Sequence, residues 1–348
     1  DCGNSGTTLR LLMGVLAGRV NAILDGDASL RRRPIARVAE PLKTMGAKIT
    51  SNRTDRPPVY LRRQNTILRP IRYTMKVASA QVKSALILAA LRASGSSVIG
   101  SPAVTRDHTE RMLAAMGAKL RSTGKTVRVN PSHLTSPGLL HVPGDVSSAV
   151  YLLCAAAAVP GSSLRVRSVG VNPTRSAALD VMRRMGARIQ ISNRTQWSGE
   201  PVADIVVAGG TPLRGVTVPA RLVPILIDEI PALCALAVTA RGTFVVRGAG
   251  ELKVKESNRI RTTVALLRSF GADARALADG IVVRGGKELR APRRVNTHGD
   301  HRIGLSAAIL AAAAQAPITI DDADCIATSF PKFAQTWKAA FGSKRTLQ

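Results

Sequence analysis

The stretch from Glu251 to Arg259 holds the densest group of residues in this chain that can do chemistry. Seven of its nine residues are polar or charged, and apolar residues at helical spacing follow, which predicts a polar helix N-terminus that can hold an anion. On such a helix Lys255 and Arg259 would share a face, with Glu256 one step round. Two cations beside a carboxylate suit a site that binds a charged substrate and moves a proton. The alternative is a solvated first helical turn that holds only an ion pair.

Composition limits the class of protein. The chain has 348 residues and is 45% apolar, enough for two packed domains. Its longest apolar runs, such as 307–314, are too short to span a membrane. The cysteines are scattered without a CxxC pair, which argues against a zinc site or a disulfide framework and favours a reducing, cytoplasmic compartment.

The formal net charge of +28 is compatible with nucleic-acid binding. However, Lys and Arg are dispersed along the chain, and only 3% of the residues are aromatic, which leaves few platforms for base stacking. Anionic small substrates and a composition bias explain the charge at least as well. A basic nucleic-acid-binding repeat protein remains an alternative, with steep salt dependence of DNA or RNA affinity as its signature.

A Met-Gly-Ala or Phe-Gly-Ala tripeptide recurs at Gly46, Gly117, Gly186 and Gly271. Each glycine follows an amphipathic segment and precedes a β-rich run, which predicts a helix that ends at the glycine and leads into a strand. A polar turn that opens an Ala/Leu-rich helix, a further strand and a second helix complete each repeat. The sequence therefore predicts an α/β (α+β) fold built from repeated βαβαββ units.

The repeats also divide the chain into expected domains. Pro, Ser and Gly are concentrated at 132–143, which predicts an N-terminal domain at 1–142 and a C-terminal domain at 143–348. Residues 1–47 hold only the helix–strand–helix second half of a repeat. We therefore expect the first repeat to be incomplete and the N-terminal domain to lack its first part.

Polar turns at helix starts in a repeat protein tend to face one side, and two facing halves would form a cleft. The residues expected to line it are Asn4, Thr7, Arg33, Ser79, Gln81, Lys83, Arg106, Asp228, Glu229, Lys255, Glu256, Arg259, His301 and Arg302. This set suits a substrate with two or more phosphates or carboxylates. Alternatives remain for several members: Asp228 as a helix N-cap, Ser79 and Gln81 as caps, and 31–33 as a solvated loop. His298 and His301 have no third ligand nearby in sequence, so no metal site is expected.

Several stretches in order along the chain match one family. They are Gly3–Arg10, Gly26–Ile35, Ser79–Ala85, Thr105–Glu110, Pro143–Asp145, Asp228–Pro231, Lys255–Arg259, Gly299–Arg302 and Ile326–Pro331. The chain resembles the 5-enolpyruvylshikimate-3-phosphate synthases of the shikimate pathway of aromatic amino acid biosynthesis, and its motifs are most similar to the bacterial forms grouped as class II. The resemblance implies the two-domain enolpyruvyl transferase fold.

That family transfers the enolpyruvyl group of phosphoenolpyruvate to the 5-hydroxyl of shikimate 3-phosphate and releases phosphate, without a metal or organic cofactor. By resemblance, shikimate 3-phosphate would be held by Ser79, the backbone of Ala80, Gln81, Arg106, Asp228 and Lys255. Phosphoenolpyruvate would be held by Gly6, Arg33, Gln81, Arg259 and Arg302. Asp228 would take the hydroxyl proton and Glu256 would exchange a proton with the methylene carbon. The implied protein is a cytoplasmic monomer that binds neither nucleic acid nor membrane.

The chain departs from the family pattern at a few positions. The family's Pro-Gly-x-Lys-Ser-x-x-x-Arg stretch would precede Asp1, so we expect the chain by itself to be nearly inactive. Asn258 stands where Asp is usual, Val146 where Pro is common, and Thr328 where some members have a Lys that contacts phosphoenolpyruvate. The related transferase that acts on UDP-N-acetylglucosamine is a second alternative. Its loop carries a reactive cysteine, and 26–34 has none.

Overall fold

The computed structural model describes residues 1–52 and 55–342. It divides into two compact units. Unit 1 comprises 1–141 and 198–200, and unit 2 comprises 142–197 and the rest of the chain from 201. Among the described residues, no helix combines the length and the apolar character that crossing a bilayer requires.

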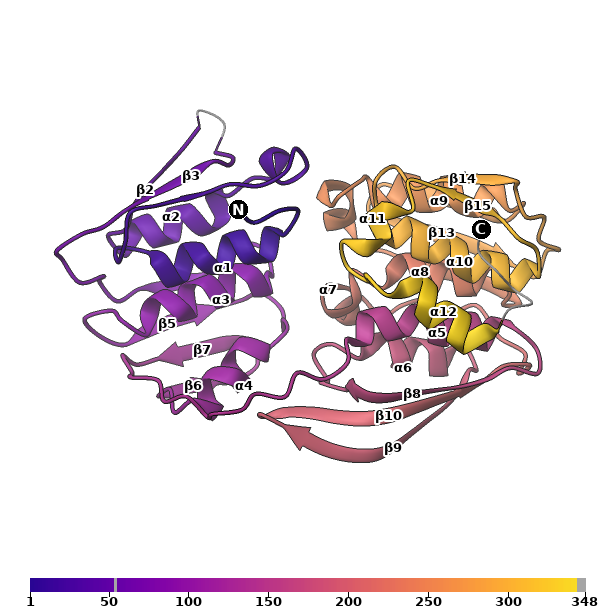
Figure 1. Cartoon of the computed structure of the whole chain (residues 1–348), viewed down its shortest axis with the longest axis horizontal. Helices are drawn as coiled ribbons and strands as arrows, with labels where there is room; N and C mark the ends of the chain where they lie inside the picture. The colour runs from indigo at the N-terminus through magenta and orange to yellow at the C-terminus, as the bar shows by residue number, and fades with distance from the viewer. Residues whose placement is uncertain (53–54, 343–348) are drawn as a thin grey trace. The chain divides into compact units, whose positions relative to one another are not determined.

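The described residues of unit 1 form four helices and two sheets (indigo to purple in Figure 1). The helices are α1 (Gly6–Leu16), α2 (Ala36–Thr44), α3 (Ala80–Ala90) and α4 (His108–Ala115), with a 3₁₀ turn η1 at Leu30–Arg32. One antiparallel sheet has the order β1 (Ala22–Leu24), β3 (Val59–Arg62), β2 (Lys48–Ser51). The other has the order β4 (Arg72–Thr74), β5 (Ser97–Gly100), β7 (Thr126–Val129), β6 (Leu120–Ser122), and only its β4–β5 pair is parallel.

Helix α3 is the centre of unit 1. Its own side chains are mostly apolar or small, and they are buried on nearly every side of the helix. Helix α1 packs against it at Gly14. A Cβ at this position would lie 2.1 Å from the carbonyl oxygen of Ala85, so only glycine permits this approach. The close packing fixes the N-terminal ends of α1 and α3, where the candidate residues of unit 1 lie.

Unit 2 contains three sheets around a helical centre (Figure 1). Its helices are α5 (Val146–Ala158), α6 (Ala177–Arg184), α7 (Val223–Leu226), α8 (Ile230–Ala237), α9 (Arg259–Ser269), α10 (His301–Ala314), α11 (Asp324–Ala327) and α12 (Phe333–Phe341), with 3₁₀ turns η2 (Ala220–Leu222) and η3 (Gly250–Val254). Two sheets are antiparallel: β8 (Ser163–Gly170), β10 (Glu200–Ala208), β9 (Arg188–Trp197), and β11 (Gly242–Val246), β13 (Gly280–Gly285), β12 (Asp273–Leu277). The third is a parallel pair, β14 (Arg294–Asn296) and β15 (Thr319–Asp321).

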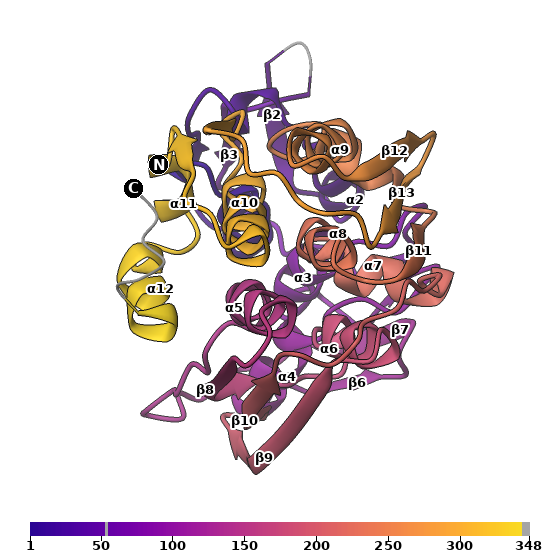
Figure 2. The same ribbon diagram turned by 90° about the vertical axis from the view of Figure 1, so that its right-hand side faces the viewer.

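Helices α5, α8 and α10 form the centre of unit 2 and are seen nearly end-on in Figure 2. They are rich in alanine and leucine and are buried on most sides, because short side chains allow three helices to approach closely. Asp145 and Asp300 cap the N-termini of α5 and α10 by accepting backbone hydrogen bonds. Each repeat in unit 2 thus supplies one of the three central helices, and the N-terminal end of that helix is polar.

The four repeated glycines end their helices as predicted. Gly46, Gly117, Gly186 and Gly271 all have positive φ, between 81° and 100°. In each case the N–H of the following alanine bonds back to the carbonyl five residues earlier, at 2.9–3.1 Å, which is the Schellman arrangement. The predicted strands follow at β2, β6, β9 and β12. The short strands β4 and β14 were not predicted.

Candidate active site

The polar stretch before α9 is helical only up to Val254, where the 3₁₀ turn η3 ends. Lys255 has an extended backbone after η3, and the helix starts only at Arg259, because the Asn258 side chain accepts a hydrogen bond from the Arg261 N–H and caps it. The expectation that Lys255 and Arg259 share a helical face is therefore wrong. Both side chains nevertheless reach Asp228: Lys255 Nζ and Arg259 Nη1 lie 3.2 and 3.3 Å from its Oδ1.

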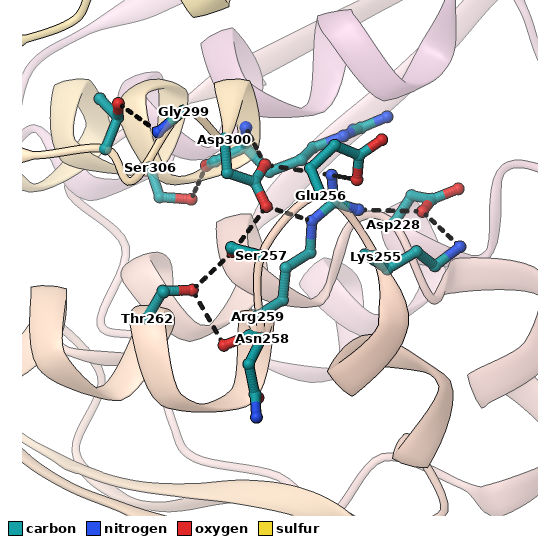
Figure 3. A network of polar contacts seen from close by, with 12 residues as sticks. Asp228, Lys255, Glu256, Ser257, Asn258, Arg259, Thr262, Gly299, Asp300 and Ser306 are labelled. Atoms are coloured by element: carbon teal, nitrogen blue, oxygen red, sulfur yellow. Dashed lines mark hydrogen bonds and ion pairs between the residues drawn. The ribbon is translucent and has the colours of Figure 1, made fainter. Parts of the chain in front are cut away.

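Arg259 is the hub of the candidate residues in unit 2 (Figure 3). Its side chain is only 2% exposed, and it donates hydrogen bonds to three carboxylates. Nε and Nη2 form a bidentate pair with Asp300 at 2.9 and 3.1 Å. Nη2 also contacts Glu256 Oε2 at 2.5 Å. Most of the donor capacity of the guanidinium is thus used to hold carboxylates.

The charges around Arg259 stabilise one another. Burial by itself would lower the pKa of Arg259, but the carboxylates of Asp300 and Glu256 outweigh it and raise the pKa. Burial would raise the pKa of Asp300, yet Arg259 lowers it below its usual value. Asp300 also accepts a hydrogen bond from Ser257 Oγ at 2.8 Å and caps α10 through the Arg302 N–H. The buried Asp300 therefore fixes Arg259 to the N-terminus of α10.

Arg302, in the first turn of α10, is held by a different set of groups. Its Nη1 lies 4.0 Å from Glu229 Oε1, and its guanidinium carbon lies 5.7 Å from the ring centre of Tyr151. Glu229 is completely buried and accepts a hydrogen bond from Ser147 Oγ. Burial raises the pKa of Tyr151 to about 12, and the pKa of Arg302 is raised by the charges around it in spite of burial. Arg302 therefore stays a cation in a fixed orientation.

His301 is adjacent to both arginines. Burial, Arg302 and Arg259 together lower its pKa to about 4. The imidazole is therefore neutral at neutral pH, so it adds no charge to the anion-binding cations and can accept as well as donate a hydrogen bond.

In unit 1, two guanidinium groups converge at the N-terminus of α1. Arg33 Nη2 donates to Asn4 Oδ1 at 3.0 Å, and Asn4 donates to Asp27 Oδ2 at 2.7 Å. A Cβ on Gly6 would lie 3.0 Å from Arg10 Nη1 and 3.2 Å from Arg33 Nη1, so glycine is what lets both arginines approach the helix. Free N–H groups and two cations make this end of α1 a candidate anion site. Gly6 and Thr7 belong to the helix itself rather than to the turn before it.

Gln81 links α3 to α1. Its Nε2 donates to Thr7 Oγ1 at 2.7 Å, and its Oε1 accepts from Arg10 Nη1 at 2.5 Å. The second Arg10 nitrogen donates to the Pro34 carbonyl at 3.1 Å. Gln81 is thus not a cap, whereas Ser79 is the N-cap of α3 and accepts a hydrogen bond from the Val82 N–H at 3.4 Å. The N-terminal ends of both helices, including the Ala80 N–H, are held in register by these contacts.

Besides Arg259, two predicted residues lie in the interior. Lys83 is 3% exposed and forms an ion pair with Glu110 at 2.5 Å, and Glu229 is 0% exposed. Neither side chain therefore lines a surface. Each is held in the interior by a polar partner, Lys83 by Glu110 and Glu229 by Ser147, as a buried charge requires. Arg106 lies just before Asp107, the residue that precedes α4.

Within unit 2 the structure brings together Asp228, Lys255, Glu256 and Arg259, and Glu229 with Arg302. Within unit 1 it brings together Asn4 with Arg33, and Thr7 with Gln81. Sequence reasoning missed the contributions of Arg10, Ser147, Tyr151 and Asp300. A single arginine in the apolar helix 6–16 was a usable signal for Arg10, whereas nothing local marks Tyr151. No group of three His, Cys, Asp or Glu side chains in residues 1–52 and 55–342 is arranged to hold a metal ion.

The family model of EPSP synthase (3-phosphoshikimate 1-carboxyvinyltransferase) matches residues 1–337. A 3-phosphoshikimate 1-carboxyvinyltransferase of Shouchella clausii is 45% identical over 335 residues, which cover 96% of this chain and 77% of that protein.

The EPSP synthase of Acinetobacter baumannii superposes with a TM-score of 0.85 at 38% identity, over 97% of this chain and 78% of that one. The enolpyruvyl transferase NikO from Streptomyces tendae has a TM-score of 0.71 at 17% identity, over 95% and 74% of the two chains, a likeness of fold alone. The predicted enolpyruvyl transferase fold and the family resemblance are both confirmed. The chain belongs to the EPSP synthase (3-phosphoshikimate 1-carboxyvinyltransferase) family.

Proposed function

We propose that this chain transfers the enolpyruvyl group of phosphoenolpyruvate to the 5-hydroxyl of shikimate 3-phosphate and releases phosphate. The observation that carries the proposal is the Arg259 cluster in a member of this family. One buried guanidinium holds two partly exposed carboxylates, Asp228 and Glu256, whose side chains are each 16% exposed. Two carboxylates at fixed positions among cations suit a reaction that removes one proton and delivers another.

The proposed chemistry assigns a separate task to each carboxylate. Asp228 takes the proton of the 5-hydroxyl as its oxygen bonds to C2 of phosphoenolpyruvate. Glu256, which carries a proton when the substrates bind, delivers it to C3, which gives a tetrahedral intermediate with a methyl group. Glu256 then removes a proton from that methyl group as the C2–O bond to phosphate breaks, the enol ether forms, and the proton held by Asp228 leaves with the phosphate. Lys255 and Arg259, both in contact with Asp228, hold its carboxylate in place for the proton transfer and stabilise the negative charge that develops.

The substrate-holding residues follow from charge and geometry. We assign phosphoenolpyruvate to Gly6, Arg33, Gln81, Arg259 and Arg302. The end of α1 supports this assignment, because its N–H groups lie beside Arg33 and a side chain at position 6 would crowd the Arg10 and Arg33 guanidinium groups. We assign shikimate 3-phosphate to Ser79, the Ala80 backbone, Gln81, Arg106, Asp228 and Lys255. We assign a supporting role to five further residues. Three of them lie next to the substrate-holding side chains, namely Asn4, Thr7 and His301, and two are buried, Lys83 and Glu229.

Arg259 imposes a condition on anion binding. Since four of its five N–H donors already reach three carboxylates, a bidentate contact to bound phosphoenolpyruvate must share or replace the contacts to Glu256 or Asp228. The bidentate pair with Asp300 would remain and keep the guanidinium in place. Binding would then loosen the hold of Arg259 on Glu256 at the moment when Glu256 must deliver its proton.

The remaining parts of the proposal concern partners and compartment. We propose that the enzyme works without a metal or organic cofactor, as a cytoplasmic monomer that binds neither nucleic acid nor membrane. The four cysteines are buried free thiols, which supports a reducing compartment. The names of the relatives favour shikimate 3-phosphate over UDP-N-acetylglucosamine as the acceptor.

Phosphate release tests the proposed function. The purified protein, carrying a family-type Pro-Gly-x-Lys-Ser-x-x-x-Arg stretch ahead of Asp1, is incubated with phosphoenolpyruvate alone, with shikimate 3-phosphate added, or with UDP-N-acetylglucosamine added, and free phosphate is measured together with the mass of the acceptor. We expect release and an enolpyruvyl adduct only with shikimate 3-phosphate. Release that is independent of the acceptor, or an adduct on the UDP-sugar, would contradict the proposal.

A further inference from the structure

Lys83 and Glu110 form an ion pair in the interior of unit 1. The two residues are 3% and 4% exposed, and Lys83 Nζ lies 2.5 Å from Glu110 Oε1. Among the described residues, neither oxygen of Glu110 has a hydrogen-bond donor apart from this ammonium. Each charge is therefore stabilised by the other, and their directional contact fixes the position of α3 relative to α4.

Two further polar contacts join the same segments. Ser84 Oγ and Thr109 Oγ1 lie 2.7 Å apart, and both residues are buried. Lys83 Nζ also lies 3.5 Å from the carbonyl oxygen of Thr105. The first turn of α3 is thus connected to the stretch 105–110 at three points, two of which have matched partners on adjacent residues of each helix.

These contacts lie beside residues to which the proposed function assigns shikimate 3-phosphate. Lys83 is two residues after Gln81 and four after Ser79. Thr105, whose carbonyl faces Lys83, directly precedes Arg106. The ion pair is therefore placed to set the distance between the α3 group, Ser79 to Gln81, and the guanidinium of Arg106.

We propose that Lys83 and Glu110 are positioning residues for the shikimate 3-phosphate part of the site. This inference rests on the proposed function and extends it, because the two side chains bind each other in the interior of unit 1 and act on the substrate only through the residues that they position. A buried ion pair adds little net stability compared with apolar residues of similar size, whereas its direction is specific. An apolar replacement of both residues should therefore fold but lose the fixed spacing.

The main test is the double variant Lys83→Met/Glu110→Leu, which removes both charges together. We expect its far-UV circular dichroism and urea midpoint to stay close to those of the unchanged protein. We expect the Kd and KM for shikimate 3-phosphate to rise about tenfold, since small misplacements of binding groups are costly. The KM for phosphoenolpyruvate should change less than about twofold, because only Gln81 among its unit 1 residues lies on α3, whereas Gly6 and Arg33 lie at the end of α1.

The matched control is Glu40→Leu/Lys43→Met on α2, which removes an exposed ion pair of 3.0 Å in the same unit. Both substrate constants should stay unchanged in it. A second variant, Ser84→Ala/Thr109→Val, removes the other side-chain contact without touching a charge. It should raise the KM for shikimate 3-phosphate about threefold by the same reasoning. If the charge-pair variant does not fold, this variant is the test of the positioning role.

Two results would overturn the inference alone: a folded double variant that binds shikimate 3-phosphate normally, or equal changes in the constants of both substrates. A simple loss of folded protein lowers the apparent kcat without separating the two KM values, so it is distinguishable from misplacement. If the unchanged protein neither binds shikimate 3-phosphate nor releases phosphate in its presence, the proposed function fails, and this inference fails with it.

Discussion

Replacing Arg259 with lysine tests the hub of the unit 2 cluster. The change keeps the positive charge and removes the planar fork. In the structure the guanidinium uses three nitrogens to reach Asp228, Glu256 and Asp300. A lysine ammonium is a single nitrogen, so it cannot reproduce the bidentate pair with Asp300 and also reach the other two carboxylates.

The expected cost follows from the contacts. If two charge-assisted hydrogen bonds are lost, at about 1.5–3 kcal/mol each, unit 2 loses about 3–6 kcal/mol of stability. A domain has about 5–15 kcal/mol in total, so Arg259→Lys should fold with a clearly lower midpoint of unfolding. Because the fork also serves phosphoenolpyruvate in the proposed site, its KM should rise more than that for shikimate 3-phosphate.

Tryptophan fluorescence during urea unfolding is the matching assay, since both tryptophans, Trp197 and Trp337, lie in unit 2. Arg261→Lys, two residues along on the exposed face of α9, is the control and should leave the midpoint and both KM values unchanged. An unchanged midpoint in Arg259→Lys would refute the view that the fork holds the cluster together. Equal rises in both KM values would refute the division of the substrates.

Three further expectations concern single residues. Asp228→Ala and Glu256→Gln should each lower kcat about 10²–10⁴-fold with normal circular dichroism; near-normal turnover would remove that residue from the mechanism. Gly6→Ala should raise the KM for phosphoenolpyruvate about tenfold, because the new methyl group crowds Arg33; a rise confined to shikimate 3-phosphate would contradict this. The pKa of His301 is about 4 in the folded protein against an ordinary 6.5. As pH falls, the unfolded state therefore binds the proton first, and the free energy of unfolding decreases between pH 6.5 and pH 4 by at most about 3 kcal/mol. His301→Asn should flatten that slope in urea titrations, and an unchanged slope would count against it.

Local signals predicted much of the fold. The four glycines with positive φ end their helices because αL geometry follows from glycine itself and from the residues next to it. The N-cap of α3 at Ser79 is equally local. The path of Lys255 was not predictable from spacing, because the polar run before Asn258 has no apolar period to fix where the helix begins.

Tertiary pairing explains what the sequence did not show. Lys83 and Glu229 read as surface charges, yet both are buried by partners that are 27 and 82 residues away in sequence, Glu110 and Ser147. Asp300 and Arg259 are 41 residues apart. The types of the candidate residues were readable from the sequence, whereas their partners depend on how α5, α8 and α10 pack.

Deuterium incorporation tests the central claim most directly, namely that Glu256 adds and removes a proton at the methylene carbon during enolpyruvyl transfer. The protein is incubated with phosphoenolpyruvate and shikimate 3-phosphate in D₂O, and the product is examined by mass spectrometry and proton NMR. We predict an enolpyruvyl product of shikimate 3-phosphate that carries deuterium in its vinyl methylene group, formed far more slowly by Glu256→Gln. A product without deuterium at that carbon, or equal deuteration and rate in Glu256→Gln, would contradict the account.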